Sequence, residues 1–146
     1  MIRHILVVCV GNICRSPMAE ALLRDALREQ QDIIVESAGL GAVVDHPASE
    51  HAATLMRERG LDISQHRARQ ITPDMVHDAD LVLVMEAGHK RAIDMNEPAA
   101  RAKIYRLGEW QDTDIKDPYR QPREAFEAAL ADIDEGVAEW TRRIAT

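Results

Sequence analysis

The chain has 146 residues, of which 46% are hydrophobic and 29% are charged, and its formal net charge is −7. This length fits one domain over residues 1–146, and the acidic balance speaks against nucleic acid or an anionic membrane as a partner. No apolar run is long enough for membrane insertion or for a signal peptide, so we expect a cytoplasmic protein whose two cysteines are thiols.

Four short apolar runs predict the strands of a sheet, at residues 5–9, 33–35, 81–85 and 104–107. The runs at 5–9 and 81–85 are apolar throughout, which is typical of strands that are buried on both faces of a parallel sheet. Segments with helical spacing lie between the runs. This alternation predicts an α/β fold with a parallel sheet of about four strands that is flanked by helices.

Helices are predicted between these strands and after the last one. The first begins at Ser16 and Pro17, because serine caps helices well and proline is tolerated at the first helical position. Others are expected around residues 52–60, just after Thr72, and over residues 87–95. The final helix packs on the sheet through an apolar stripe at helical spacing. The residues of this stripe are Phe126, Leu130, Ile133, Val137, Trp140 and Ile144.

The first strand leads into the segment Cys9-Val10-Gly11-Asn12-Ile13-Cys14-Arg15-Ser16, in which five residues separate a cysteine from Arg-Ser. A loop that curls into a helix start directs backbone N–H groups inward, and with the helix dipole these groups form a cradle for an anion. The same field favours the thiolate of Cys9, and the planar fork of Arg15 can hold two phosphate oxygens. Together these groups predict a site that attacks phosphate.

Each residue of this loop also has an ordinary interpretation. A lone cysteine on a strand is commonly a buried core thiol, and a lone arginine commonly forms a surface ion pair. The placement of both before a helix start favours the phosphate site. A nucleotide-binding loop is excluded, because such a loop ends in Gly-Lys-Ser/Thr and this one ends in Cys14-Arg15-Ser16.

The polar loop over residues 108–121 contains a candidate proton donor, Asp117, in the segment Asp117-Pro118-Tyr119. Phosphotyrosine hydrolysis releases a phenolate whose conjugate acid has a pKa of about 10, so a proton donor eases its departure. Pro118 restrains Asp117 toward an extended backbone, and Tyr119 can stack beside an aromatic ring. Asp112 and Asp114 lie close by, and spacing alone does not choose among the three carboxyls.

With these residues in place, the chain resembles the low-molecular-weight protein-tyrosine phosphatases over nearly its whole length. The likeness lies in residues 9–17, Ser-Ala-Gly at 37–39, residues 66–70, the strand ending at Met85, and residues 117–119. The resemblance implies a four-stranded parallel sheet and a reaction through a phospho-cysteine. In that reaction Cys9 is the nucleophile, Arg15 holds the phosphate, and Asp117 is the acid and base. No metal and no cofactor are implied.

The resemblance also implies a buried polar network, made of Asn12, Ser16, Ser37 and His66, that steadies the phosphate loop. Asn12 suits a left-handed backbone turn, and Ser16 can donate to the sulfur of Cys9. Substrate contacts are expected from the loop and from two residues beyond it, namely Val10, Gly11, Asn12, Ile13, Cys14, Ser16, Leu40 and Tyr119. Four histidines are expected to be ordinary surface residues: His46, His51, His77 and His89.

Cys14 resembles the second loop cysteine of the family. Under oxidation it can trap a sulfenic acid on Cys9 as a disulfide, which protects the nucleophile from irreversible damage. It can equally be a small side chain that packs under the loop. The sequence leaves both interpretations open.

Residues 7–17, 37–41 and 117–120 most resemble the bacterial members of the family, which serve capsule or exopolysaccharide production. Those members act on the tyrosine-rich tail of a membrane-bound tyrosine autokinase. We therefore expect such a phosphotyrosine protein as the partner and inorganic phosphate as the product. The eukaryotic type has an aromatic residue after Ser-Ala-Gly, whereas this chain has Leu40, Val43 and Val44, so a more open pocket wall is expected.

Three other functions stay open at this point. Arsenate reductases can share the fold and the loop, but they pass oxidation to further cysteines, and this chain has none beyond Cys14. Protein-arginine phosphatases have a threonine-like residue at the loop position before the second cysteine. This chain has Ile13 there, whose methyl groups better suit an aromatic ring. A phosphopeptide-binding module that lost catalysis is the third alternative, although Cys9, Arg15 and Asp117 are all present.

Overall fold

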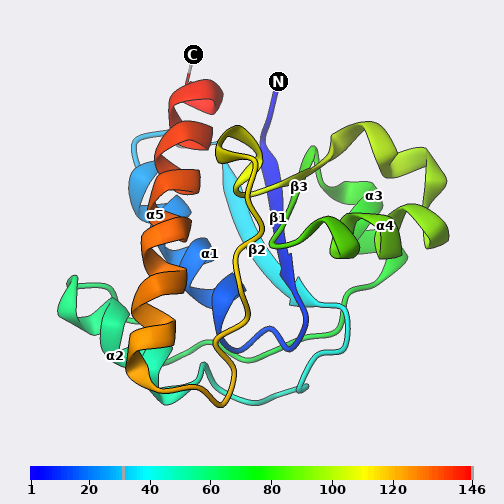
Figure 1. Cartoon of the computed structure of the whole chain (residues 1–146). Helices are drawn as coiled ribbons and strands as arrows, with labels where there is room; N and C mark the ends of the chain where they lie inside the picture. Colours follow the sequence, from blue (N-terminus) through cyan, green and yellow to red (C-terminus); the bar gives the residue numbers. More distant parts are fainter. Residues whose placement is uncertain (31, 146) are drawn as a thin grey trace.

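Four parallel strands form the central sheet of the computed structural model, which describes residues 1–30 and 32–145 (Figure 1). The sheet order is β2-β1-β3-β4, with bounds β1 His4–Cys9, β2 Ile34–Gly39, β3 Leu81–Val84 and β4 Ile104–Arg106. Ile5 of β1 pairs with Val35 on one side and Leu81 on the other. The predicted parallel sheet is confirmed, although β2 continues to Gly39 because it pairs with β1 along its whole length.

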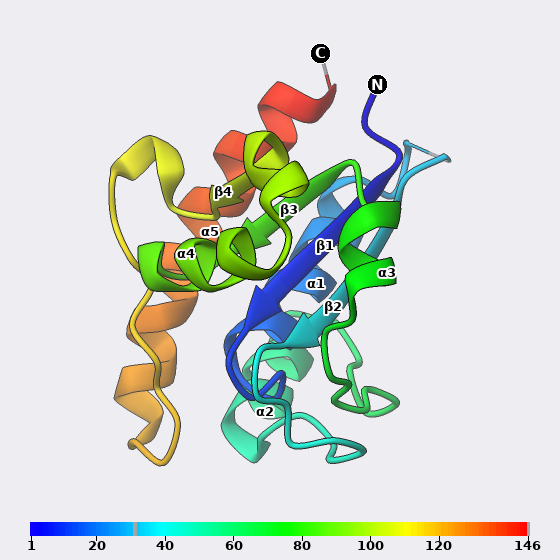
Figure 2. The same ribbon diagram turned by 90° about the vertical axis from the view of Figure 1, so that its right-hand side faces the viewer.

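Helices cover both faces of this sheet (Figures 1 and 2). One face carries α1 Arg15–Ala26, α2 Glu50–Glu58 and α5 Arg123–Ala145. The other carries α3 Pro73–Asp78, α4 Ala87–Asn96 and the 3₁₀ helix η1 Pro98–Lys103, which was not predicted. The remaining helical segment, between β4 and α5, is the short 3₁₀ helix η2 Glu109–Gln111.

Side chains of β1 alternate between two apolar clusters, one under each layer of helices. Ile5, Val7 and Cys9 belong to the cluster beneath α1, α2 and α5. Leu6 and Val8 belong to the cluster beneath α3 and α4. Because both faces are covered, the strand is apolar throughout rather than alternating, as the sequence indicated.

The start of α1 differs from the prediction. The helix begins at Arg15, with Cys14 as its N-cap residue, rather than at Ser16 and Pro17. The Ser16 hydroxyl does not cap the helix, because it lies 2.9 Å from the sulfur of Cys9. Elsewhere the predictions hold: Thr72 caps α3 by accepting from the Met75 N–H, and Gly60 follows α2 with a φ of +78°.

Helix α5 fixes the chain segment that follows β4. The Trp140 indole N–H donates to the carbonyl of Leu107 at 3.0 Å, and Leu107 is fully buried. One turn earlier, Gly136 brings the helix so close that an added Cβ would lie 2.7 Å from the Leu107 carbonyl oxygen. The predicted stripe from Phe126 to Trp140 is buried, so α5 presses the start of the 108–121 loop against the sheet. Among the described residues, no helix has the length and apolar character needed to span a membrane.

We expect Gly136→Ala to lower the free energy of unfolding by about 1–3 kcal/mol, because the new methyl group meets backbone that cannot move aside. Chemical denaturation checks this. Gly88→Ala is the matched control, since Gly88 is an exposed glycine of α4 with only the Arg91 side chain nearby. That change should raise stability by up to about 1 kcal/mol through helix propensity. Equal effects of the two substitutions would contradict the proposed packing at Gly136.

Candidate active site

A cavity of about 140 Å³ lies where β1 ends and α1 begins. Its lining residues are Cys9, Val10, Gly11, Ile13, Cys14, Arg15, Gly41, Val43, Asp117 and Tyr119. Most of the residues that the sequence marked for substrate contact are therefore together. Three of them are not in this lining. Asn12 and Ser16 are fully buried, and Leu40 packs against the apolar cluster beneath α3 and α4, so that Gly41 and Val43 form that wall instead.

The loop after Cys9 is held open by the segment that follows β2. The carbonyls of Cys9, Val10 and Gly11 accept hydrogen bonds from the N–H groups of Leu40, Gly41 and Val43, at 2.9–3.0 Å. Since the C=O and N–H of one peptide unit point in opposite directions, the N–H groups of the loop point away from that segment. This orientation is the one that an anion cradle needs.

Asn12 is the centre of a buried hydrogen-bond network beneath the loop. It has a left-handed backbone with a φ of 59°, as predicted, and its side chain is fully buried. Its Nδ2 group donates to the hydroxyls of Ser16 at 2.7 Å and Ser37 at 3.0 Å. The ring Nε2 of His66 lies 2.7 Å from the Asn12 carbonyl oxygen. The four residues expected to support the loop therefore meet in one place.

Two further members of this network were not predicted from the sequence. The backbone N–H of Arg69 donates to Asn12 Oδ1 at 2.9 Å, and the Ser37 hydroxyl donates to Glu20 at 2.5 Å. Arg69 lies in the 66–70 motif, which was a usable signal, whereas nothing in the sequence marked Glu20. A groove of about 610 Å³ opens beside Glu20 and Arg69, but neither Cys9 nor Arg15 lines it. The smaller cavity is therefore the one that contains the reactive groups.

The hydroxyl of Ser16 is directed at the sulfur of Cys9, 2.9 Å away. Its oxygen already accepts from Asn12, so its own hydrogen is available to the sulfur. A hydroxyl that donates to sulfur stabilises a thiolate, both before attack and when sulfur departs as a leaving group. Cys9 itself is 2% exposed at the base of the cavity.

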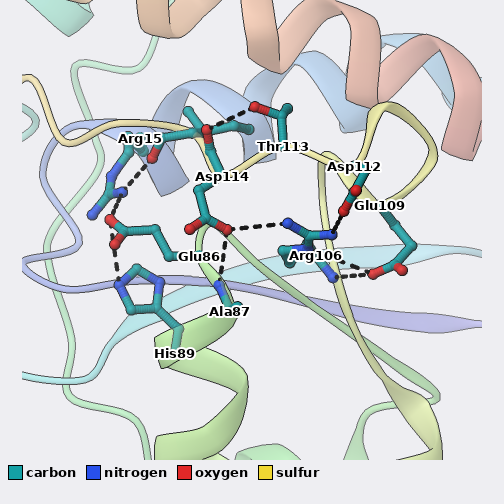
Figure 3. Close-up of polar contacts among 10 residues, drawn as sticks. Arg15, Glu86, Ala87, His89, Arg106, Glu109, Asp112, Thr113 and Asp114 are labelled. Atoms are coloured by element: carbon teal, nitrogen blue, oxygen red, sulfur yellow. Dashed lines mark hydrogen bonds and ion pairs between the residues drawn. The ribbon is translucent and has the colours of Figure 1, made fainter.

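Arg15 is a buried cation with one end fixed (Figure 3). Its Nη1 group donates to Glu86 at 2.5 Å and to the carbonyl of Ile115 at 2.6 Å. Its buried Nε has no hydrogen-bond partner among the described residues. Because unpaired buried donors are costly, an anion in the cavity that accepts from Nε would be strongly favoured. Neither Glu86 nor Ile115 was predicted from the sequence as a partner of this arginine.

The structure separates the three carboxyls of the 108–121 loop. Asp117 lines the cavity, with Oδ2 3.7 Å from Arg15 Nη2 and Oδ1 accepting from the Tyr119 N–H at 3.0 Å. Asp112 and Asp114 instead pair with Arg106, at 2.6 and 3.3 Å. Spacing alone left these candidates equal, and only Asp117 among them reaches the cavity. Tyr119 lies at its rim, with the Arg120 guanidinium 5.1 Å from the ring centroid.

His89 was expected on the surface, and this expectation is wrong. The side chain is buried on α4, with Nε2 3.8 Å from Glu86 (Figure 3). Burial, followed by the nearby positive charge of Arg15, lowers the pKa of His89 below its ordinary value. The imidazole is therefore neutral at pH 7, and Arg15 is the cation that pairs with Glu86.

Cys14 is a free, buried thiol next to Cys9 in the cavity wall. Burial raises the pKa of Cys14 to about 11, so the side chain stays protonated at neutral pH. It cannot serve as a second nucleophile in that form. The described residues contain no group of three or more His, Cys, Asp or Glu side chains arranged to hold a metal ion.

Comparison with known proteins places this site in a family. The family described as low molecular weight phosphotyrosine protein phosphatase matches residues 4–146. The chain is 51% identical over 144 residues to the probable low molecular weight protein-tyrosine-phosphatase EpsP of Ralstonia solanacearum, covering 99% of this chain and 97% of that protein.

Two solved structures share the fold. The tyrosine phosphatase Wzb from Escherichia coli K30, in complex with sulphate, is 39% identical with a TM-score of 0.93, covering 99% of each chain. The YwlE arginine phosphatase from Geobacillus stearothermophilus is 34% identical with a TM-score of 0.90, covering 97% of this chain and 92% of that one. The fold alone therefore does not separate the two activities.

We expect Asn12→Ala to lower the free energy of unfolding by about 3 kcal/mol, because Ser16, Ser37 and the Arg69 N–H lose their partners and alanine resists the left-handed backbone. Asp45→Ala is the control, since Asp45 has a similar φ of 69° on an exposed loop. It should cost about 1 kcal/mol or less. Comparable losses in urea denaturation would show that backbone strain, and not the network, explains the effect.

In a Cys9→Ser variant, we expect iodoacetamide to leave Cys14 unmodified at pH 8, because a thiol with a pKa of about 11 is almost fully protonated there and is buried. Mass spectrometry of the intact protein measures the added carbamidomethyl groups. Guanidinium-unfolded protein is the positive control and should be labelled. Labelling of the folded variant at the rate of a free cysteine would contradict the protected state.

Proposed function

The chain belongs to the low molecular weight phosphotyrosine protein phosphatase family, and we propose that Cys9, Arg15 and Asp117 carry out its hydrolysis of phosphotyrosine. One observation carries this assignment. Cys9, Arg15 and Asp117 all line one cavity of about 140 Å³, and the buried Nε of Arg15 has no hydrogen-bond partner among the described residues. Nucleophile, phosphate clamp and proton donor are thus within reach of the same phosphoryl group.

In the first step the Cys9 thiolate attacks phosphorus and the bond from phosphorus to the tyrosine oxygen breaks. Asp117, entering this step protonated, donates its proton to the departing phenolate oxygen. Arg15 binds the equatorial phosphate oxygens through Nε and Nη2, while Glu86 and Ile115 hold its Nη1 group. The products of the step are free tyrosine side chain and phospho-cysteine.

In the second step a water molecule attacks the phospho-cysteine, and the Asp117 carboxylate accepts the proton from that water. The bond between sulfur and phosphorus breaks, and sulfur leaves as a thiolate. The Ser16 hydroxyl, 2.9 Å from the sulfur, stabilises the charge that develops on it. Inorganic phosphate is released, Asp117 is protonated again, and the enzyme is ready for another cycle.

An aromatic phosphoester suits the walls of the cavity. Ile13 and Val43 present methyl groups, and Tyr119 presents its ring at the rim. The methyl groups of Ile13 favour a phenyl ring over the polar guanidinium of phosphoarginine, which supports tyrosine rather than arginine phosphatase activity. A dedicated arsenate reductase would need a further cysteine beyond Cys14, and the chain has none.

As the physiological substrate we propose the phosphorylated tyrosine-rich tail of a membrane-bound tyrosine autokinase that controls capsule or exopolysaccharide export. The likeness to EpsP and Wzb over nearly the full chain supports this role. A flexible tail fits a cavity whose wall after β2 is formed by Gly41 and Val43 rather than by an aromatic residue. Dephosphorylation of the purified kinase tail from the same organism tests the assignment, with an unrelated phosphotyrosine peptide as the control.

We expect wild-type protein to release phosphate from a phosphotyrosine peptide, Cys9→Ser to be inactive, and Asp117→Asn to be slowed by about 10²–10⁴-fold, the usual contribution of a general acid. Phosphate release is measured with a phosphoarginine peptide alongside. Full activity in Cys9→Ser would rule out the nucleophile assignment. Faster turnover of phosphoarginine would move the protein to the sister activity, and binding without turnover would make it a phosphopeptide-binding module.

A further inference from the structure

Asp117 has few contacts of its own that fix its position. Its side chain is 44% exposed, and the contacts of its carboxyl are the N–H of Tyr119 in the same loop and Arg15 at 3.7 Å. The loop that carries it, residues 107–122, contains only the short helix η2 as regular structure. A proton donor must nevertheless be aimed to within a fraction of an ångström. The aim must therefore come from another part of the loop.

The loop is attached to the sheet just before Asp117. The N–H of Ile115 donates to the Met85 carbonyl at 2.9 Å, and the Ile115 side chain is fully buried. The next residue toward the N-terminus, Asp114, makes a second attachment through its side chain. Its Oδ1 accepts from the N–H of Ala87 at 3.0 Å and from Arg106 at 3.3 Å (Figure 3).

The bond from Ala87 to Asp114 satisfies one of the N–H groups that have no partner within helix α4. Glu86 is the N-cap residue of α4, but its side chain makes no cap hydrogen bond. Its carboxylate is instead bonded to Arg15. An uncapped N–H at a helix start needs an acceptor, and Asp114 supplies it from the facing loop. The start of α4 is therefore joined to Arg15 through Glu86 and to the loop through Asp114.

Arg106 at the end of β4 holds the other side of Asp114. Its guanidinium contacts three carboxylates of the loop, Asp112 at 2.6 Å, Asp114 at 3.3 Å and Glu109 at 3.9 Å. The hydrogen bond to Asp112, and then that to Asp114, raises the pKa of Arg106 above its ordinary value, so the cation persists at any working pH. Of these carboxylates, Asp114 is the one that also bonds to α4.

We propose that Asp114 is a positioning residue for catalysis: by capping α4 from the facing loop and pairing with Arg106, it holds Asp117 at the angle needed to protonate the leaving group. The inference rests on the proposed function, because it takes Asp117 as the proton donor. It assigns Asp114 to proton delivery and not to phosphate binding. Asp114 is not among the partners of Arg15, which are Glu86, the Ile115 carbonyl and Asp117.

Aryl phosphates with different leaving groups separate these roles. 4-Nitrophenolate is a much weaker base than phenolate, so its departure depends less on a proton donor. Asp114→Ala should lower kcat/KM for phenyl phosphate by about tenfold or more, but by less than about threefold for 4-nitrophenyl phosphate. The inhibition constant of inorganic phosphate should change by less than about twofold, because Arg15 is undisturbed.

Three further variants sharpen the test. Asp114→Asn keeps an oxygen acceptor for the Ala87 N–H and should stay within about threefold of wild type on both substrates. Asp112→Asn removes a charge from the same Arg106, tolerates the left-handed φ of 49°, and should behave as wild type. In an Asp117→Asn background, adding Asp114→Ala should cost nothing more, since a residue that acts through Asp117 has nothing left to position.

Equal losses with both leaving groups, an additive double variant, or an Asp112→Asn defect equal to that of Asp114→Ala would each overturn the inference. Failure of the proposed function looks different: wild type would not turn over phosphotyrosine, or Cys9→Ser would stay active. Circular dichroism verifies the fold of each variant. If Asp114→Ala does not fold, Asp114→Ser takes its place, because its shorter side chain cannot reach Ala87 and Arg106 together and should give the same selective loss.

Discussion

A buried cation is the constraint around which this site is built. The Arg15 guanidinium is 1% exposed, and a charge in that position is tolerated only when ionic and hydrogen-bond partners surround it. Those partners are Glu86, after β3, and the carbonyl of Ile115, in the loop after β4. To satisfy one arginine, the fold must bring the ends of β1 and β3 and the 107–122 loop to a single edge of the sheet. Asp117, the proposed proton donor, lies in that loop.

Asn12 solves the corresponding problem for the phosphate loop. A loop that turns its N–H groups toward an anion needs an unfavourable backbone conformation, which persists only where the surrounding structure holds it. Asn12 holds the loop through a left-handed turn and a fully buried side chain. The same side chain directs the Ser16 hydroxyl toward Cys9. Support of the loop and activation of the sulfur are therefore one network, and loss of a single amide disturbs both.

Charged residues outside the cavity also connect the elements that carry the site. Glu86 at the start of α4 bonds to Arg15, and Asp114 accepts from the Ala87 N–H of the same helix. Arg106 pairs with carboxylates of the loop that would otherwise repel one another. In the proposed mechanism, Asp117 is therefore oriented by residues that do not line the cavity.

Local sequence patterns were sufficient to predict structure that forms between residues close together in the chain. The buried strand, the cysteine-to-arginine spacing and the helix start are adjacent, so the sequence indicated the phosphate loop and the parallel sheet directly. It failed where a partner is distant or where a residue has two uses. The local pattern made Ser16 a helix cap, whereas its hydroxyl lies against the sulfur of Cys9, as the family resemblance implied. Leu40 packs against an apolar cluster rather than in the cavity, and His89 is buried rather than exposed.

By itself, then, the sequence determined the fold class and pointed to Cys9 and Arg15 as the proposed nucleophile and phosphate clamp, because strand, loop and helix preferences act over a few residues. The family resemblance indicated Asp117 rather than Asp112 or Asp114, but the physical reason for that choice lies in the tertiary structure. These carboxyls have similar chemistry and nearly the same place in the chain, and only the packing of their loop against β3, α4 and α5 sends one to the cavity and two to Arg106. Long-range contacts of this kind depend on the geometry of the assembled sheet, which no local pattern encodes.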